Sequence, residues 1–148
     1  MRLLFIGFGN VAKETARILM EKELYRGLDL THSVVGIFTQ RHGGVEDNKG
    51  LNLKCVMNNL TERNSLVGEE NELSSLNPLE AAQKLDYDVL VELSALSIRE
   101  KGEPASSYIN AALERGKSVV SANKGPVAFN YHKLKKLADE KGAKYMFE

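Results

Sequence analysis

The sequence predicts an α/β fold in which one doubly wound parallel sheet carries helices on both faces. Four short apolar runs are continuous rather than alternating, which is typical of strands buried on both faces. Segments with helical spacing separate these runs and indicate right-handed crossovers between parallel strands. A glycine-rich turn directly follows the first run. The sequence has no internal repeat and no low-complexity linker, so residues 1–148 are expected to form a single domain.

The expected strands comprise residues 3–6, 34–38, 89–91 and 118–120, with a fifth candidate at residues 144–147. Gly43 and Gly44 indicate a loop after the second strand. The polar segment 64–75 is also expected to be a loop.

The first helix is expected over residues 11–26, with a stripe on one face made of Val11, Thr15, Ile18, Leu19 and Lys22. Further helices are expected at residues 51–60, 78–85 and 104–115. The last of these opens on a proline and ends before Gly116, the usual start and stop signals. Asn130 is expected to cap the final helix, in which Leu134, Leu137 and Ala138 share a face.

Composition excludes several classes of function. Twenty basic residues balance twenty acidic residues, so no net field favours nucleic acid or an anionic membrane. The single cysteine, Cys55, cannot form an internal disulfide and is expected to be a small half-buried side chain. The sequence shows no targeting segment and no apolar run near the ~20 residues that a membrane helix needs. The cytoplasm is therefore the expected compartment.

The first apolar run is followed by Gly7-Phe8-Gly9-Asn10-Val11-Ala12, which matches the G-x-G-x-x-G/A pattern between a strand and a helix. Gly7 would permit the tight turn, Gly9 would let a phosphate approach the backbone, and Ala12 would keep the helix close to the strand. The N-terminus of that helix offers unpaired N–H groups and a partial positive charge to a pyrophosphate. The motif predicts a Rossmann-type dinucleotide site; a tight turn without a ligand is the alternative.

The residues after the second strand bear on the choice of cofactor. NAD-selective domains usually carry Asp or Glu there, whereas this sequence has Thr39-Gln40-Arg41-His42 and no carboxylate before Glu46. Arg41 could pair with a 2′-phosphate through two parallel hydrogen bonds. We therefore expect NADP in preference to NAD, while a solvated loop arginine or the use of both cofactors stays open.

Polar side chains also follow the later strands. Ser94 comes after the third expected strand, and Ser121-Ala122-Asn123-Lys124 comes after the fourth. Because ligands of open parallel sheets lie across the carboxyl ends of the strands, Ser94 could hydrogen-bond the phosphates or ribose of a cofactor. Lys124 could both orient a substrate oxygen and exchange a proton. A surface lysine in a turn is an equally weighted alternative.

Other candidate groups are better explained structurally. His32, His42 and His132 lie far apart in the sequence, with no carboxylate or cysteine at ligand spacing, which argues against a metal site. The lysines of the last helix are expected to form its solvated face. Glu92, at the end of the third expected strand, is expected to serve as a structural cap or hydrogen-bond acceptor.

These segments resemble the homoserine dehydrogenase family. The matching elements are residues 7–11, Val89-Leu90-Val91-Glu92-Leu93-Ser94, Gly102-Glu103-Pro104, residues 116–120, residues 134–148 and Ala122-Asn123-Lys124-Gly125-Pro126-Val127-Ala128. The resemblance covers nearly the whole chain and is weakest at residues 43–85. The glycine motif is generic, whereas Ala-Asn-Lys-Gly-Pro after this strand is quite specific. The family reduces aspartate semialdehyde to homoserine with NADPH or NADH, a step toward threonine and methionine.

The resemblance implies roles for individual residues. Phe8, Asn10 and Val11 would contact the cofactor through the glycine turn, and Ser94 and Ser121 would approach the ribose and nicotinamide. Lys124 would lie between nicotinamide and substrate and assist hydride transfer. Arg41 and Lys54 match positions that hold a 2′-phosphate in some members, and Glu148 matches the start of a loop that can bind a monovalent metal ion. The full set of expected cofactor contacts is Gly7, Phe8, Gly9, Asn10, Val11, Arg41, Ser94, Ala95, Ser121, Asn123 and Lys124.

Two departures from the family pattern bear on activity. Ser94 and Ala95 replace a more usual threonine-rich pair. The family's substrate-binding and dimerising domain, which supplies an aspartate, a second lysine and most of the homoserine pocket, would follow Glu148. We therefore expect this chain to bind a nicotinamide dinucleotide without turnover by itself, and to meet its small-molecule substrate only with that domain. A fragment, a truncated product, one part of a split enzyme and a homo-oligomer all stay open.

Two further functions stay open. A stand-alone nucleotide sensor would bind the cofactor without any reaction and would have no need of Lys124. Another semialdehyde or imine reductase could share the fold. A nucleophilic cysteine would favour an acylating semialdehyde dehydrogenase, but Cys55 precedes the third expected strand and lies in the wrong region.

Overall fold

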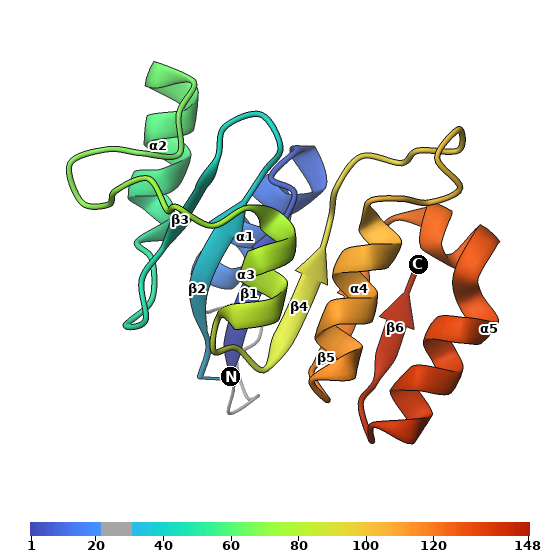
Figure 1. Cartoon of the computed structure of the whole chain (residues 1–148). Coiled ribbons are helices and arrows are strands. Elements are labelled where there is room, and N and C mark those ends of the chain that lie inside the picture. The colour runs from blue at the N-terminus through green and yellow to red at the C-terminus, as the bar shows by residue number, and fades with distance from the viewer. Residues whose placement is uncertain (22–30) are drawn as a thin grey trace.

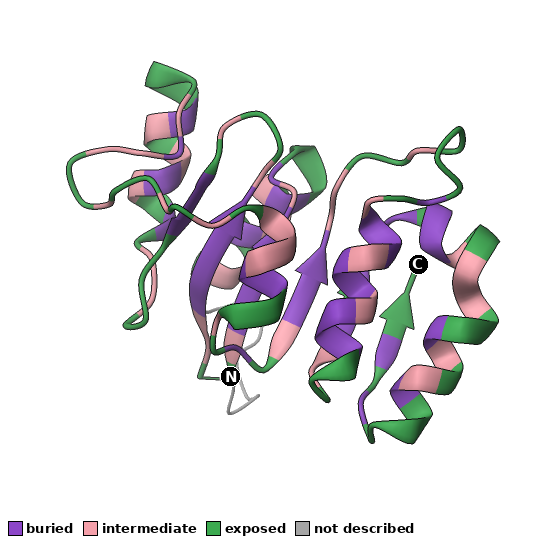
Figure 2. Ribbon diagram, in the orientation of Figure 1, coloured by how far each residue is buried: buried purple, intermediate pink, exposed green. Residues whose placement is uncertain are grey.

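The computed structural model describes residues 1–21 and 31–148 and contains one six-stranded sheet. Its strands are β1 (Arg2–Ile6), β2 (Ser33–Phe38), β3 (Gly44–Glu46), β4 (Val89–Glu92), β5 (Ser118–Ser121) and β6 (Tyr145–Phe147). The five expected strands are confirmed, and each observed end lies within one residue of the expected one. Continuous apolar runs identified them because both faces of the central strands are covered (Figure 2).

Five helices of the described residues flank the sheet: α1 (Asn10–Met20), α2 (Leu53–Arg63), α3 (Pro78–Lys84), α4 (Ala105–Glu114) and α5 (Lys124–Glu140). Helices α3, α4 and α5 cover one face, where Leu4, Leu90 and Val119 point into their core. Helices α1 and α2 cover the other face, over Phe5, Ile37 and Val91 (Figure 1). The doubly wound α/β fold is therefore confirmed.

The strand order is β3-β2-β1-β4-β5-β6, which is the order of Rossmann-type domains. Strand β1 lies between β2 and β4 and is parallel to both. The chain therefore leaves β1 toward one edge of the sheet and later returns to fill the other side. At such a switch point the connections diverge and leave a crevice at the carboxyl ends of β1 and β4.

The loop expected at Gly43 and Gly44 is confirmed for Gly43 and wrong for Gly44, which begins β3 and pairs antiparallel with β2. Only residues 39–43 connect the two strands, whereas a parallel crossover needs a dozen or more residues. The chain therefore turns back as a hairpin. Strand β3 is thus an antiparallel edge strand on an otherwise parallel sheet.

The stripe expected on the first helix was wrong in part: Leu19 packs against the core under α1 and α2, but the residues that α1 buries do not belong to the stripe. The buried residues of α1 are Ala12 and Ala16, whereas Val11 and Ile18 are half exposed. Two alanines on the inner face let the helix axis approach the sheet closely. Lys22, expected to belong to the stripe, and the expected helical residues 22–26 lie outside the described residues.

The last helix begins earlier than expected. Its cap is Asn123, whose side chain accepts a hydrogen bond from the backbone N–H of Gly125, and its first residue is Lys124. Pro126 is compatible with this start, because backbone N–H groups in the first helical turn have no intrahelical acceptor. Asn130 instead ties α5 to α4 by donating to the Ser106 hydroxyl at 3.0 Å.

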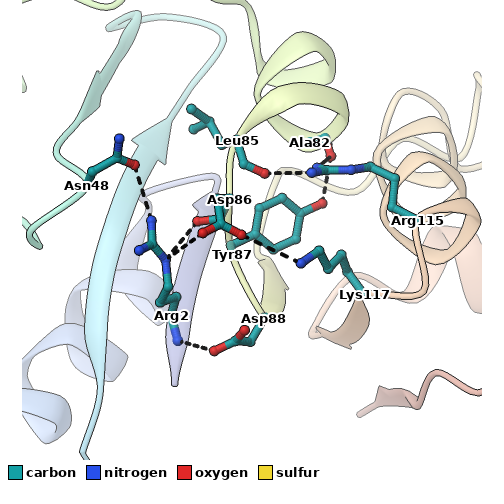
Figure 3. A network of polar contacts seen from close by, with 9 residues as sticks. All are labelled: Arg2, Asn48, Ala82, Leu85, Asp86, Tyr87, Asp88, Arg115 and Lys117. Carbon is teal, nitrogen blue, oxygen red and sulfur yellow. Dashed lines mark hydrogen bonds and ion pairs between the residues drawn. The ribbon is translucent and has the colours of Figure 1, made fainter.

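A network of charged and aromatic side chains lies at the amino ends of β1 and β4, opposite the crevice (Figure 3). The Arg115 guanidinium donates to the backbone carbonyls of Ala82 and Leu85, at 2.7 and 2.9 Å, and lies 5.3 Å from the ring centroid of Tyr87. Tyr87 is fully buried and its hydroxyl also donates to Ala82. Arg2 donates to the carbonyl of Asp86, so β1, α3, β4 and α4 are joined at one point.

In the part of the chain that the structure describes, none of the helices is both long enough and apolar enough to cross a membrane.

Candidate functional site

A cavity of about 440 Å³ lies at the switch point of the sheet, where the carboxyl ends of β1, β2 and β4 meet. This volume falls within the range of small-molecule sites. The expected contacts among its lining residues are Gly7, Phe8, Gly9, Arg41, Ser94 and Ala95. Segments separated by more than thirty residues in the sequence are thus brought to one place, as expected for the carboxyl ends of neighbouring parallel strands.

Gly7 is required by the close approach of two strand ends. Its φ is +93°, a conformation that side chains with a Cβ rarely adopt, and a Cβ there would lie 2.4 Å from the carbonyl carbon of Leu93. The backbone of Gly7 also donates to the carbonyl of Phe38 at 2.8 Å. Gly7 therefore lets β1, β2 and the segment after β4 converge at the cavity.

Gly9 differs from Gly7, because nothing in the described part of the protein requires a glycine at this position. Its φ of −83° suits any residue, and an added Cβ would meet no atom within 4 Å. The space above Gly9 is open. A Cβ would fill space that a phosphate approaching the backbone requires.

Within residues 1–21 and 31–148, no side chain caps the N-terminus of α1. Its cap, Gly9, makes no side-chain hydrogen bond, and the first turn contains no acidic residue. By contrast, α2, α3 and α5 are each capped by an asparagine side chain, from Asn52, Asn77 and Asn123. The N–H groups and partial positive charge at the start of α1 are therefore available to an anion.

The side chains of Phe8, Asn10 and Val11 lie in two environments. Phe8 is buried, and its ring packs near that of Phe5, with 6.3 Å between ring centroids. Asn10 and Val11 are exposed on the first turn of α1 and lie outside the cavity lining. Their contact with a cofactor stays a prediction.

Glu92, at the end of β4, is fully buried. Its carboxylate accepts hydrogen bonds from the backbone N–H and the hydroxyl of Ser94 and from the hydroxyl of Ser121. Burial raises the pKa of the Glu92 carboxyl, whereas the hydrogen bonds from these serines act in the opposite direction. Glu92 was expected to be a hydrogen-bond acceptor, and the structure confirms this.

Ser121 and Asn123 are buried and do not belong to the cavity lining. The Ser121 hydroxyl donates to Glu92 at 2.8 Å and accepts from the backbone of Asn123 at 3.1 Å. The Asn123 amide donates to the carbonyl of Ser94 at 3.2 Å and caps α5. Both side chains therefore support the two segments around the cavity, and their direct contact with a cofactor stays a prediction.

Lys124 is the first residue of α5 and is exposed. The ion pairs found among the described residues do not include it. An ammonium group at a helix N-terminus is electrostatically unfavourable, so helix stability does not account for a lysine here. It stands outside the cavity lining, at the carboxyl end of β5.

The turn between β2 and β3 presents Gln40, Arg41 and His42 to the cavity. The Thr39 hydroxyl closes this turn by accepting from the backbone N–H of His42 at 2.8 Å. Arg41 is exposed, and none of the ion pairs among the described residues includes it. Lys54, the second expected cation, is the second residue of α2 and is not part of the cavity lining.

Pro78 and Tyr108 line the cavity and were not expected to do so. Pro78 is the first residue of α3, and Tyr108 lies in α4, so both come from the helical layer. Neither residue follows a strand, so the expectation based on strand ends did not include them. Both line the cavity together with Thr39 and Gln40, which follow β2.

Glu148 is exposed, and its backbone N–H donates to the carbonyl of Ser121 at 3.2 Å. Among the described residues there is no group of three or more His, Cys, Asp or Glu side chains that could hold a metal ion. The monovalent cation site at Glu148 stays a prediction.

The strand order, the switch-point cavity, the convergence at Gly7 and the uncapped start of α1 define the class of Rossmann-type nucleotide-binding domains. The comparisons with known proteins agree. Residues 7–148 match the family model described as homoserine dehydrogenase, NAD binding domain.

Homoserine dehydrogenases from two microorganisms are similar in sequence. The protein from Methanocaldococcus jannaschii is 27% identical over 148 residues, which is 100% of this chain and 44% of that protein. The NAD(+)-dependent homoserine dehydrogenase from Pseudomonas canavaninivorans is 31% identical over 146 residues, 93% of this chain and 39% of that protein. The chain therefore spans less than half the length of these relatives.

Solved structures agree with the sequence relatives. A hyperthermophilic archaeal homoserine dehydrogenase in complex with NADPH has 28% identity and a TM-score of 0.85, over 99% of this chain and 43% of that chain. The homoserine dehydrogenase from Thermoplasma acidophilum shares the fold, with 22% identity and a TM-score of 0.82. The match covers 100% of this chain and 43% of that chain. The present chain belongs to the homoserine dehydrogenase NAD-binding domain family.

Proposed function

We propose that this chain binds NADP(H) at the switch-point cavity and forms the cofactor half of a homoserine dehydrogenase. The observation that carries the proposal is the open space above Gly9 at an uncapped helix N-terminus. A dinucleotide pyrophosphate fits this place because backbone N–H groups and the helix dipole both favour an anion. The 2′-phosphate would pair with Arg41, at the end of β2.

The remaining residues fit the other half of the dinucleotide. Ser94 and Ala95 line the cavity on the β4 side, away from Arg41. A nicotinamide cofactor, when bound, supplies the hydride that reduces aspartate semialdehyde to L-homoserine. Lys124, at the start of α5, would steady the substrate oxygen and hold a proton for it. A further domain would provide most of the substrate pocket.

A cytoplasmic location, assembly into a homo-oligomer and a place in threonine and methionine biosynthesis belong to the same proposal. They rest on the family and on the named relatives.

Calorimetric titration of the purified chain with NADPH and with NADH tests the proposal. We expect saturable binding of NADPH, with NADH weaker. A folded chain that binds neither cofactor at millimolar concentration would contradict it.

The stand-alone sensor remains the second candidate, and Lys124→Ala separates the two. A chimera would carry this chain in place of the matching segment of the Methanocaldococcus jannaschii relative. The proposed function requires homoserine-dependent reduction of NADP⁺ by the chimera and its loss in the Lys124→Ala version, with NADPH binding retained. A sensor would give a chimera that binds NADPH but shows no reaction with or without Lys124.

A further inference from the structure

Glu92 is a fully buried acidic side chain whose presence the stability of the fold does not explain. The ion pairs among residues 1–21 and 31–148 do not include Glu92. Burying a carboxylate without a counter-charge is costly even when it accepts hydrogen bonds, and an apolar residue at a buried strand end avoids that cost. The groups that Glu92 organises therefore indicate what it does.

The carboxylate joins the two segments that leave β4 and β5. One oxygen accepts from the backbone N–H and the hydroxyl of Ser94, and the other accepts from the Ser121 hydroxyl at 2.8 Å. Ser121 in turn accepts from the backbone N–H of Asn123. Asn123 reaches back to the Ser94 carbonyl and also caps α5. The network is thus closed, with Glu92 at its base.

The same contacts fix what the cavity presents to a ligand. The single hydroxyl proton of Ser94 is donated to Glu92, and the Ser94 oxygen also accepts from the Asn123 amide at 3.4 Å. One lone pair therefore remains for a ligand in the cavity that Ser94 lines. A ligand group beside Ser94 must therefore donate a hydrogen bond. The ribose hydroxyls and the carboxamide NH₂ group of a nicotinamide nucleoside are donors of this kind.

We propose that Glu92 is a positioning residue for the nicotinamide half of the cofactor, acting through the hydroxyl of Ser94 and through the Ser121–Asn123 link to α5. This inference rests on the proposed function. The glycine turn lies between the β2 end, which carries Arg41, and the β4 and β5 ends, which carry Ser94 and Lys124. Loss of Glu92 therefore affects one half of the dinucleotide and spares the adenosine half.

Two ligands separate the halves: NADPH, and 2′,5′-adenosine diphosphate, which is the adenosine half with its 2′-phosphate. Calorimetry measures both dissociation constants for the wild-type chain, Glu92→Ala and Glu92→Gln. We expect Glu92→Ala to weaken NADPH binding about tenfold or more while 2′,5′-adenosine diphosphate stays within about twofold. Glu92→Gln retains one acceptor oxygen and is expected to fall between wild type and Glu92→Ala.

Glu103→Ala is the matched control, because Glu103 also accepts from the backbone N–H and hydroxyl of a serine, Ser107, but outside the cavity. It is expected to leave both dissociation constants unchanged. Ser121→Ala removes one hydrogen bond to Glu92 and replaces Glu92→Ala in the comparison should that variant fail to fold.

Equal weakening of both ligands, or no change in NADPH binding, would overturn the role of Glu92 while leaving the proposed function intact. Failure of the wild-type chain to bind either ligand would overturn the proposed function, and the inference with it.

Discussion

At the residue scale, the two glycines of the turn, Gly7 and Gly9, are needed for different physical reasons. Gly7→Ala places a Cβ 2.4 Å from the carbonyl carbon of Leu93 at a φ of +93°. We expect it to lower the free energy of unfolding by about 2–3 kcal/mol. Gly9→Ala meets no protein atom, so its cost should be at most about 1 kcal/mol, from poorer capping.

Urea denaturation and NADPH titration of both variants check this pair. Gly9→Ala is expected to remain folded and to bind NADPH at least about tenfold more weakly, because its methyl group occupies the approach of the pyrophosphate. Normal NADPH affinity in Gly9→Ala would contradict the assignment of the turn as a phosphate site.

Arg41 permits a second prediction about a single residue. Arg41→Ala should weaken NADPH binding about tenfold and leave NADH binding nearly unchanged, because only NADPH carries the 2′-phosphate. Arg63→Ala, another exposed arginine at the end of α2, is the control. An equal loss for both cofactors in Arg41→Ala would mean that the guanidinium does not read the 2′-phosphate.

At the element scale, the buried strands could be predicted because each is a continuous apolar run, and α3 because Asn77 and Pro78 mark its start. The glycine turn could be placed because it depends on neighbouring residues. By contrast, β3 forms through pairing with β2, and the sequence of Gly44–Glu46 has no strand pattern. The cavity residues Pro78 and Tyr108 depend on how helices pack on the sheet, which periodicity does not determine.

Arg115 joins the end of α4 to the end of α3 and gives a prediction about elements (Figure 3). Arg115→Ala should lower the free energy of unfolding by about 1–2 kcal/mol, because the Leu85 carbonyl loses the guanidinium donor, the Ala82 carbonyl keeps only the Tyr87 hydroxyl, and Tyr87 loses a cation over its ring. Arg115→Lys keeps the charge but lacks the planar fork, so it should recover little of the loss. Urea denaturation measures both; full stability in Arg115→Lys would show that charge alone matters.

At the scale of the whole molecule, the two ends of the strands have different roles. The cavity lies at the carboxyl ends, where Gly7, Ser94 and Arg41 come together. The network of Arg2, Asp86 and Arg115 lies at the amino ends and joins strands to helices. Because the stabilising network lies at the amino ends, the polar groups around the cavity are available to a ligand.

Two buried tyrosines predict how the stability of the whole domain depends on pH. Burial raises the pKa of Tyr87 and of Tyr145 to about 12, above the ordinary value of 10.0. The folded chain therefore holds protons that the unfolded chain has released between about pH 10 and pH 12. Their contribution is complete below pH 10, and the free energy of unfolding should fall as pH rises through this window.

Tyrosine-to-phenylalanine variants isolate this effect from other groups that titrate at high pH. Among the described residues the Tyr145 hydroxyl has no hydrogen-bond partner, so Tyr145→Phe should cost nothing at pH 7, whereas Tyr87→Phe should cost about 1 kcal/mol for its lost bond to Ala82. Above pH 10 both variants should lose stability less steeply than wild type, because each lacks one phenol that must ionise on unfolding. Urea denaturation from pH 7 to pH 11.5 gives these slopes, and absorbance at 295 nm follows the phenolates. A slope for Tyr145→Phe equal to that of wild type would show that this phenol ionises alike in both states.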